Sequence, residues 1–189
     1  MQGMKRKQEF EKYHKGNWHS LATDPQAWLK SAEYLKEAAD ALHKQLWPAR
    51  EEPYGHKSAA ADLLYGPVYM LLAGLAIETL IKGIIVAKHP DFVKQQKLSG
   101  KLTHHNLPEL YRTATLVTSQ SGRLITSRSH DDLLLRLQNY VENFGRYPVT
   151  KTKQDMQKLT DTSFAGQTDP KKIDGLWDFL VKRIQPYIQ

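Results

Sequence analysis

The sequence predicts an all-α protein, built as an up-and-down bundle of about five helices. Five segments carry apolar residues at the three- and four-residue spacing of a helix, and no segment shows a sustained strand-like alternation. The chain has 189 residues, which suits a single domain, and its 40% of hydrophobic residues are enough to build a core. We therefore expect a soluble helical domain that folds without a disulfide or a structural metal.

The first predicted helix begins at Asp24-Pro25 and ends before Pro48. Aspartate is a favourable N-cap and proline suits the first helical position, whereas a later proline stops a helix. Apolar residues recur along one side of this segment at Trp28, Leu35, Ala39, Leu42 and Leu46. Residues 1–23 are basic and lack the apolar run of a signal peptide, so we assign them to an N-terminal extension and residues 24–189 to one helical domain.

The second predicted helix, from Ser58 to Lys88, is the most apolar part of the chain. Its length and composition resemble a membrane span, but Glu78 and Lys82 place two charges in its middle, where lipid makes them costly. Apolar side chains occur on every side of the helix, which is typical of a central helix surrounded by others. We therefore interpret it as the core of the bundle and expect no membrane insertion.

Three further helices follow. One starts at Asn106-Leu107-Pro108, a second at Ser129 with a capping box to Asp132, and the last at Asp169-Pro170. The stretches between them are polar and are predicted loops. Within this pattern we expect two long antiparallel helices to be packed by shorter ones.

Charge and cysteine content narrow the classes of function. The net charge is +7, so acidic partners such as nucleic acid or nucleotides are electrostatically favoured. The chain has no cysteine, which excludes thiolate metal sites, cysteine nucleophiles and disulfides and agrees with a cytoplasmic location. There is also no zinc motif, Gly-rich phosphate loop or nucleophile elbow, so we expect neither a metal ion nor a cofactor.

Five segments occur in an informative order: 27–35, 76–83, 105–110, 145–148 and 169–187. Together they resemble the helices and turns of the HEPN (higher eukaryotes and prokaryotes nucleotide-binding) family, in the branch that carries an Arg-Tyr-Pro segment. The resemblance implies a dimeric helical bundle, often encoded beside a nucleotidyltransferase-type antitoxin in bacterial toxin–antitoxin or phage-defence systems. Some members of the family are metal-independent RNases that use an Arg and a nearby His.

Candidate nucleotide- or RNA-binding residues are found in three places. Glu78 and Lys82 lie four residues apart, so they form either a salt bridge or a pair that faces an anion. His105 precedes a helix start, where it can cap the helix or face an anion. Arg146 and Tyr147 combine a cation with an aromatic face, which suits phosphates and bases but is also common in solvated loops.

Arg123 and His130, with six residues between them, meet the spacing of the family's nuclease pair. In that role His130 would take the proton of the 2′-hydroxyl group and Arg123 would stabilise the phosphate. The alternative is a loop cation and a helix-start histidine. Our preferred hypothesis is a module that binds a nucleotide, RNA or a partner protein, with an RNase toxin and a structural dimerisation protein as alternatives.

Overall fold

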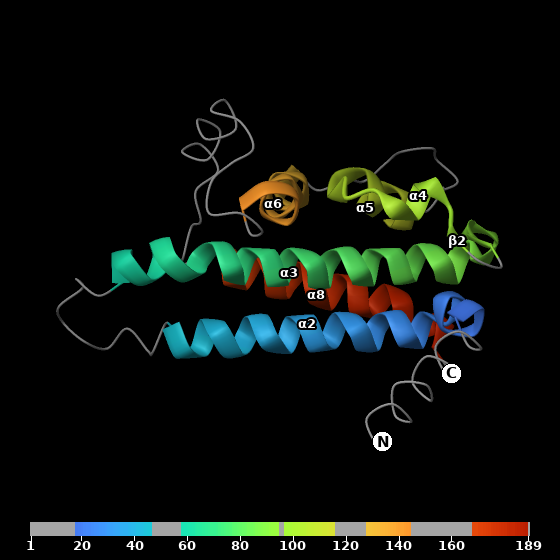
Figure 1. Ribbon diagram of the computed structural model, residues 1–189, viewed down its shortest axis with the longest axis horizontal. Coiled ribbons are helices and arrows are strands. Elements are labelled where there is room, and N and C mark those ends of the chain that lie inside the picture. Colours follow the sequence, from blue (N-terminus) through green and yellow to red (C-terminus); the bar gives the residue numbers. More distant parts are fainter. Residues whose placement is uncertain (1–17, 47–57, 95–96, 116–127, 145–167, 189) are drawn as a thin grey trace, which may run out of the picture.

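Three long helices, α2 (Pro25–Leu46), α3 (Ser58–Lys88) and α8 (Asp169–Ile184), pack along one another in this computed structural model (Figure 1). α2 and α3 run antiparallel, and α8 lies behind them in the view of Figure 1. Two shorter helices, α5 (Leu107–Thr115) and α6 (Arg128–Asn139), cover the opposite side of α3. α3 is therefore the central helix, as its composition predicts.

The structure describes residues 18–46, 58–94, 97–115, 128–144 and 168–188. Within them all five predicted helices are present, and the all-α class is confirmed. α6 starts one residue before the predicted cap and continues as a π-helix, η2 (Tyr140–Phe144). In Figure 1 α6 is seen almost along its axis while α3 lies across the page, so α6 crosses the long helices instead of running up or down beside them.

Several short elements were not predicted. They connect α3 to α5 as a 3-10 helix, η1 (Pro90–Phe92), a hairpin of β1 (Val93–Lys94) and β2 (Lys97–Leu98), and a single helical turn, α4 (Gly100–Thr103). A second 3-10 turn, η3 (Gln185–Tyr187), follows α8. Such brief elements lack the repeated apolar spacing that reveals longer ones.

Side-chain caps explain where α2 and α5 begin. The backbone N–H of Gln26 donates to the Asp24 carboxylate at 2.9 Å, as expected for the cap of α2. At α5, Asn106 accepts from the backbone N–H of Glu109, and its amide donates to the Glu109 carboxylate, both at 3.1 Å. The bond from the backbone N–H of Glu109 shows that Asn106 caps α5, and the contact between the two side chains supports this cap.

The buried side of α2 differs from the predicted one. Its buried residues are Leu29, Ala32, Lys36 and Ala39, whereas Trp28 and Leu35 are only partly buried. The predicted apolar side is confirmed in part, because Ala39 is buried and Trp28 and Leu42 pack against the core. Lys36 was not expected among the buried residues. Its ammonium group is paired with Asp40 at 2.7 Å and with Asp174 of α8 at 2.8 Å, which compensates for the loss of water.

Close approach of the helices to α3 depends on two glycines. A Cβ atom added to Gly74 would lie 2.7 Å from Val141 and 3.2 Å from the backbone oxygen of Leu137. A Cβ added to Gly83 would lie 2.7 Å from Trp28 of α2. The absence of a side chain therefore lets α6 and α2 reach the backbone of α3.

Most of the described part of α3 is covered within a single chain, although Val68 is 42% exposed. From Tyr69 to Val86 none of its side chains is exposed. The segment Gly66–Lys88 is long and apolar enough to cross a membrane, but 72% of the residues in an 18-residue apolar stretch within it are buried inside the bundle. Of the predicted N-terminal extension, residues 18–23 are helical, and Trp18 and Ala22 pack against the core.

Candidate functional site

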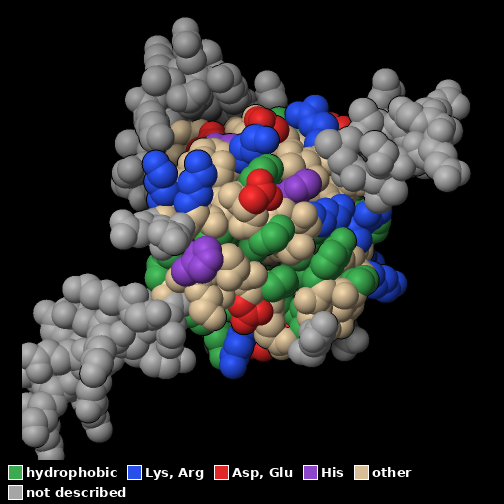
Figure 2. Space-filling model, turned by 90° about the vertical axis from the view of Figure 1, so that its right-hand side faces the viewer, with side chains coloured by type: hydrophobic (Ala, Val, Ile, Leu, Met, Phe, Trp, Pro, Cys, Tyr) green, Lys and Arg blue, Asp and Glu red, His purple; other side chains and the backbone are tan. Residues whose placement is uncertain are grey.

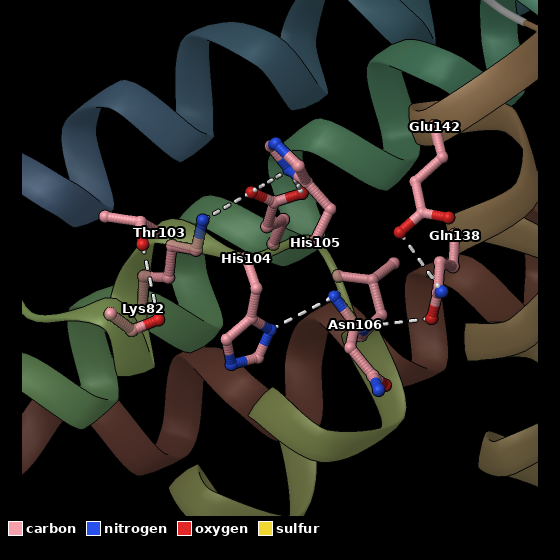
Figure 3. A network of polar contacts seen from close by, with 10 residues as sticks. Lys82, Thr103, His104, His105, Asn106, Gln138 and Glu142 are labelled. Carbon is pink, nitrogen blue, oxygen red and sulfur yellow. Dashed lines mark hydrogen bonds and ion pairs between the residues drawn. The ribbon is translucent and has the colours of Figure 1, made fainter.

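The structure brings three of the predicted binding residues together around one carboxylate. Glu78 of α3 accepts a hydrogen bond from the Lys82 ammonium group at 2.6 Å, and both of its oxygens lie 3.0 Å from Nδ1 of His105 (Figure 3). The Glu78–Lys82 contact follows from their spacing, because residues four apart share one face of a helix. The contact with His105 joins positions 27 apart in the sequence.

A network of hydrogen bonds holds the loop that carries His105. Nδ1 of His104 accepts from the backbone N–H of Asn106 at 3.2 Å, and the Gln138 side chain accepts from the backbone N–H of Leu107 at the same distance (Figure 3). The Gln138 amide then donates to Glu142 at 3.2 Å. α6 and η2 thus fix the start of α5 and, through it, the position of His105.

Burial decides between the two interpretations of Glu78 and Lys82. Only 7% of the Glu78 side chain and 10% of the Lys82 side chain are exposed, against 39% for His105. A buried ammonium group that already binds a carboxylate forms a pair with no net charge, and such a pair attracts a phosphate only weakly. The geometry fits the salt bridge, and it leaves His105 as the member of the trio that solvent reaches. His105 does not cap α5, because Asn106 occupies that position.

His130, the predicted catalytic histidine, lies at the start of α6 in an aromatic cluster. Its Nδ1 is 2.9 Å from the hydroxyl group of Tyr111, and its ring contacts Phe179 of α8 with 5.7 Å between centroids. Burial lowers the pKa of His130, although the charge of Asp131 acts in the opposite direction. The imidazole is therefore neutral at pH 7, a state in which one ring nitrogen can accept a proton.

The other predicted site residues, Arg123, Arg146 and Tyr147, lie outside the described residues. The contacts of two cations, Lys88 and Arg183, were not predicted. Lys88 donates to the backbone oxygen of Ala114 at 2.6 Å, and the Arg183 guanidinium carbon lies 4.5 Å from the centroid of the Phe179 ring. The spacing of Phe179 and Arg183 by four residues was the available signal for their contact.

An open pocket of about 390 Å³ lies where residues 18–31 meet α3 and β2. Its walls include Trp18, Leu21, Trp28, Thr79 and Leu98. The indole N–H of Trp28 donates to the backbone oxygen of Ala22 at 2.9 Å, which holds that ring in place. Sequence analysis missed this pocket because its walls come from three separate segments.

Figure 2 shows the end of the molecule that carries β2, α4 and residues 18–23. Hydrophobic side chains gather on this face, and lysine and arginine side chains lie around them. Lys94, Lys97 and Lys101, from the hairpin and α4, are exposed here, and the ammonium group of Lys101 lies 4.6 Å from the centroid of Phe92. The face combines an apolar pocket with positive charge.

Among the described residues, no group of three His, Asp or Glu side chains is arranged to hold a metal ion. In comparisons with protein-family models, curated proteins and solved structures, no match to this chain was found.

Proposed function

We propose that this chain is a HEPN-like helical module that binds a nucleotide or RNA without cleaving it, within a toxin–antitoxin or phage-defence system. The observation that carries the proposal is the pocket lined by Trp18 and Trp28, next to the exposed lysines of the hairpin and α4. Proteins that bind single-stranded nucleic acid combine aromatic rings, on which bases stack, with cations that contact the phosphates.

The size and rigidity of the pocket support this assignment. Its volume, about 390 Å³, falls in the range of small-molecule sites and suits one base. The hydrogen bond of the Trp28 indole to Ala22 orients that ring before a ligand arrives, which reduces the entropy lost on binding. We keep Arg146 and Tyr147 as further contacts to phosphate and base, and we assign Glu78 and Lys82 to the positioning of His105.

The test is fluorescence anisotropy with a labelled single-stranded RNA decamer, and with AMP as a competitor. We expect Trp18→Ala to weaken RNA binding by about 5- to 100-fold, since stacking contributes about 1–3 kcal/mol per base. Trp177→Ala is the matched control, because Trp177 is also partly buried but does not line the pocket. Equal affinities of wild type and Trp18→Ala would refute the proposal.

Arg146→Ala tests the phosphate contact inferred from the sequence. We expect weaker binding and a smaller dependence of affinity on salt, because fewer counterions are released. An unchanged salt dependence would remove Arg146 from the proposed site.

A metal-independent RNase is the second candidate, and the environment of His130 favours it. If Nδ1–H of the neutral His130 donates to the hydroxyl oxygen of Tyr111, Nε2 keeps its lone pair and can accept a proton, as a general base requires. Incubation of the protein with RNA in EDTA separates the two functions. We expect no cleavage; cleavage that His130→Ala and Arg123→Ala both abolish would establish the RNase instead.

We also propose a homodimer and a nucleotidyltransferase-type antitoxin as partners, on the strength of the family resemblance. The apolar side chains on every side of the central helix also favour a dimer. In the described part of α3, Val68 is 42% exposed, whereas no side chain from Tyr69 to Val86 is exposed. Light scattering after size exclusion tests the dimer, and a monomer mass at micromolar concentration would contradict it.

A further inference from the structure

Two hydroxyl groups belong to the mostly apolar walls of the pocket lined by Trp18 and Trp28. They are those of Ser31 in α2 and Thr79 in α3, and the other described lining residues are alanine, leucine and tryptophan. In a pocket of this kind a few polar groups fix the orientation of the ligand and provide specificity. The hydrogen bonds that these two hydroxyl groups can still make therefore bear on which base the pocket accepts.

The two indole N–H groups are not directed at the edge of a bound base. That of Trp28 already donates to the backbone oxygen of Ala22 at 2.9 Å. In the proposed function a base stacks on the ring of Trp18, so the N–H of that ring lies parallel to the base and not at its edge. Among the described lining side chains, Ser31 and Thr79 are left to recognise the edge.

The hydroxyl group of Ser31 is left as a hydrogen-bond acceptor. It donates its hydrogen to the backbone oxygen of Ala27 at 2.9 Å, and a carbonyl oxygen can only accept. The lone pairs of the Ser31 oxygen can still accept a hydrogen bond from a ligand. To donate to a ligand instead, the hydroxyl group would have to give up its bond to Ala27. Ser31 therefore favours a ligand group that donates, such as an amino group.

The hydroxyl group of Thr79 retains both of its hydrogen-bonding roles. Thr113 and Thr115 each donate to the backbone oxygen four residues earlier, at 3.0 and 2.7 Å. Within the part of the chain that the structure describes, the Thr79 side chain makes neither this bond nor any other hydrogen bond. Its hydrogen can therefore be donated to a ring nitrogen of a ligand.

Bases differ in the groups that they present to these two hydroxyl groups. Adenine and cytosine carry an amino group, which donates, next to a ring nitrogen, which accepts. Hypoxanthine and uracil carry a carbonyl oxygen in place of that amino group. Such an oxygen would face the acceptor of Ser31 without a hydrogen between them, and an unsatisfied polar contact of this kind is unfavourable.

We propose that the pocket prefers adenine and cytosine, and that Ser31 accepts from the amino group while Thr79 donates to the neighbouring ring nitrogen. This inference rests on the proposed function, in which the pocket binds one base. It adds a class of base and two residues that determine the specificity.

Titrations with AMP and IMP at constant ionic strength test the preference, because these nucleotides differ in the amino or carbonyl group of the base and carry the same phosphate. The NMR signal of the Trp28 indole N–H reports binding at this pocket, since Trp28 lines it. We expect AMP to bind at least about fivefold more tightly than IMP, the lower end of what a bidentate contact with a base edge provides. CMP and UMP should differ in the same direction.

Substitution of the two hydroxyl groups should reduce the preference. Ser31→Ala removes the acceptor, so we expect AMP to bind more weakly and IMP to bind as well as before or more tightly, a pattern that misfolding does not produce. Thr79→Val should weaken AMP binding and lower the ratio of the two affinities. Thr113→Val is the matched control, because Thr113 is also a helical threonine but does not line the pocket, and it should keep the wild-type ratio.

Equal affinities for AMP and IMP, both weakened by Trp18→Ala, would overturn this inference and leave the proposed function in place. A preference for IMP, or a preference for AMP that persists in both Ser31→Ala and Thr79→Val, would overturn it as well. If none of the four nucleotides gives a saturable shift of the Trp28 signal, the pocket binds no base, and the inference and the proposed function both fail.

Discussion

Arg136 of α6 binds the carboxylate of Asp169, the first residue of α8, through two hydrogen bonds of 2.7 and 2.6 Å. Asp169 is fully buried, and 17% of the Arg136 side chain is exposed. The bidentate geometry is the strongest form of such a pair, and the start of a helix favours a negative charge. This contact therefore ties the helix that crosses α3 to the last helix of the bundle.

Loss of Arg136 should destabilise the fold strongly. We expect Arg136→Met to lower the free energy of unfolding by about 3–5 kcal/mol, because a buried carboxylate loses its bidentate partner. Urea denaturation followed by circular dichroism measures the change. Asp174→Asn is the control: its carboxylate is 58% exposed, so we expect a loss below about 1 kcal/mol. Equal losses in the two variants would contradict the assigned role of Arg136.

Glu78 and Lys82 should be energetically coupled. Glu78→Ala removes the carboxylate that pairs with the buried Lys82, and Lys82→Ala leaves Glu78 with the contact to His105 alone, so either change should cost several kcal/mol, on the order of 3–5. Replacement of both with apolar residues should cost less than the two single losses added together. Denaturation of the two single variants and the double variant gives the coupling free energy. Strictly additive losses would show that the two side chains do not interact.

The glycines of α3 provide a test of helix packing. Gly83→Ala should destabilise the fold by about 1–3 kcal/mol, because the new Cβ would overlap Trp28. Gly175→Ala, in α8, is the matched control because nothing lies within 4 Å of its added Cβ. We expect this change to stabilise the helix by up to about 1 kcal/mol. Thermal unfolding compares the two, and a stabilising Gly83→Ala would show that α2 does not pack this closely.

The lowered pKa of His130 predicts a dependence of stability on pH. Because the folded-state pKa is lower than the unfolded value of 6.5, protonation favours the unfolded chain. The contribution of the neutral imidazole is complete above pH 6.5 and is lost as the pH falls through the folded-state pKa. We expect the stability of wild type relative to His130→Gln to decrease from pH 8 to pH 5. A difference in melting temperature between the two proteins that stays constant or increases from pH 8 to pH 5 would contradict the lowered pKa of His130.

The sequence alone was sufficient to predict the five longer helices and some contacts within one helix. Asp24 and Pro25 mark the start of α2 by local capping chemistry, and the apolar perimeter of α3 identifies the core helix. The spacing of Glu78 and Lys82 predicts their salt bridge, because the geometry of one helix places residues four apart on the same face. These features depend on neighbours in the chain, so periodicity and residue type reveal them.

Contacts between segments distant in sequence were decided by the tertiary structure. The contact of His105 with Glu78, the pairing of Arg136 with Asp169 and the pocket between residues 18–31 and β2 join segments distant in sequence. The burial of Lys36 also depends on tertiary structure, because Asp174 of another helix forms an ion pair with its ammonium group. Which side chains meet in such contacts depends on how the helices cross, and the crossing is set by packing over the whole core, including Gly74 and Gly83 of α3. The residue pattern of one helix does not predict how that helix crosses another.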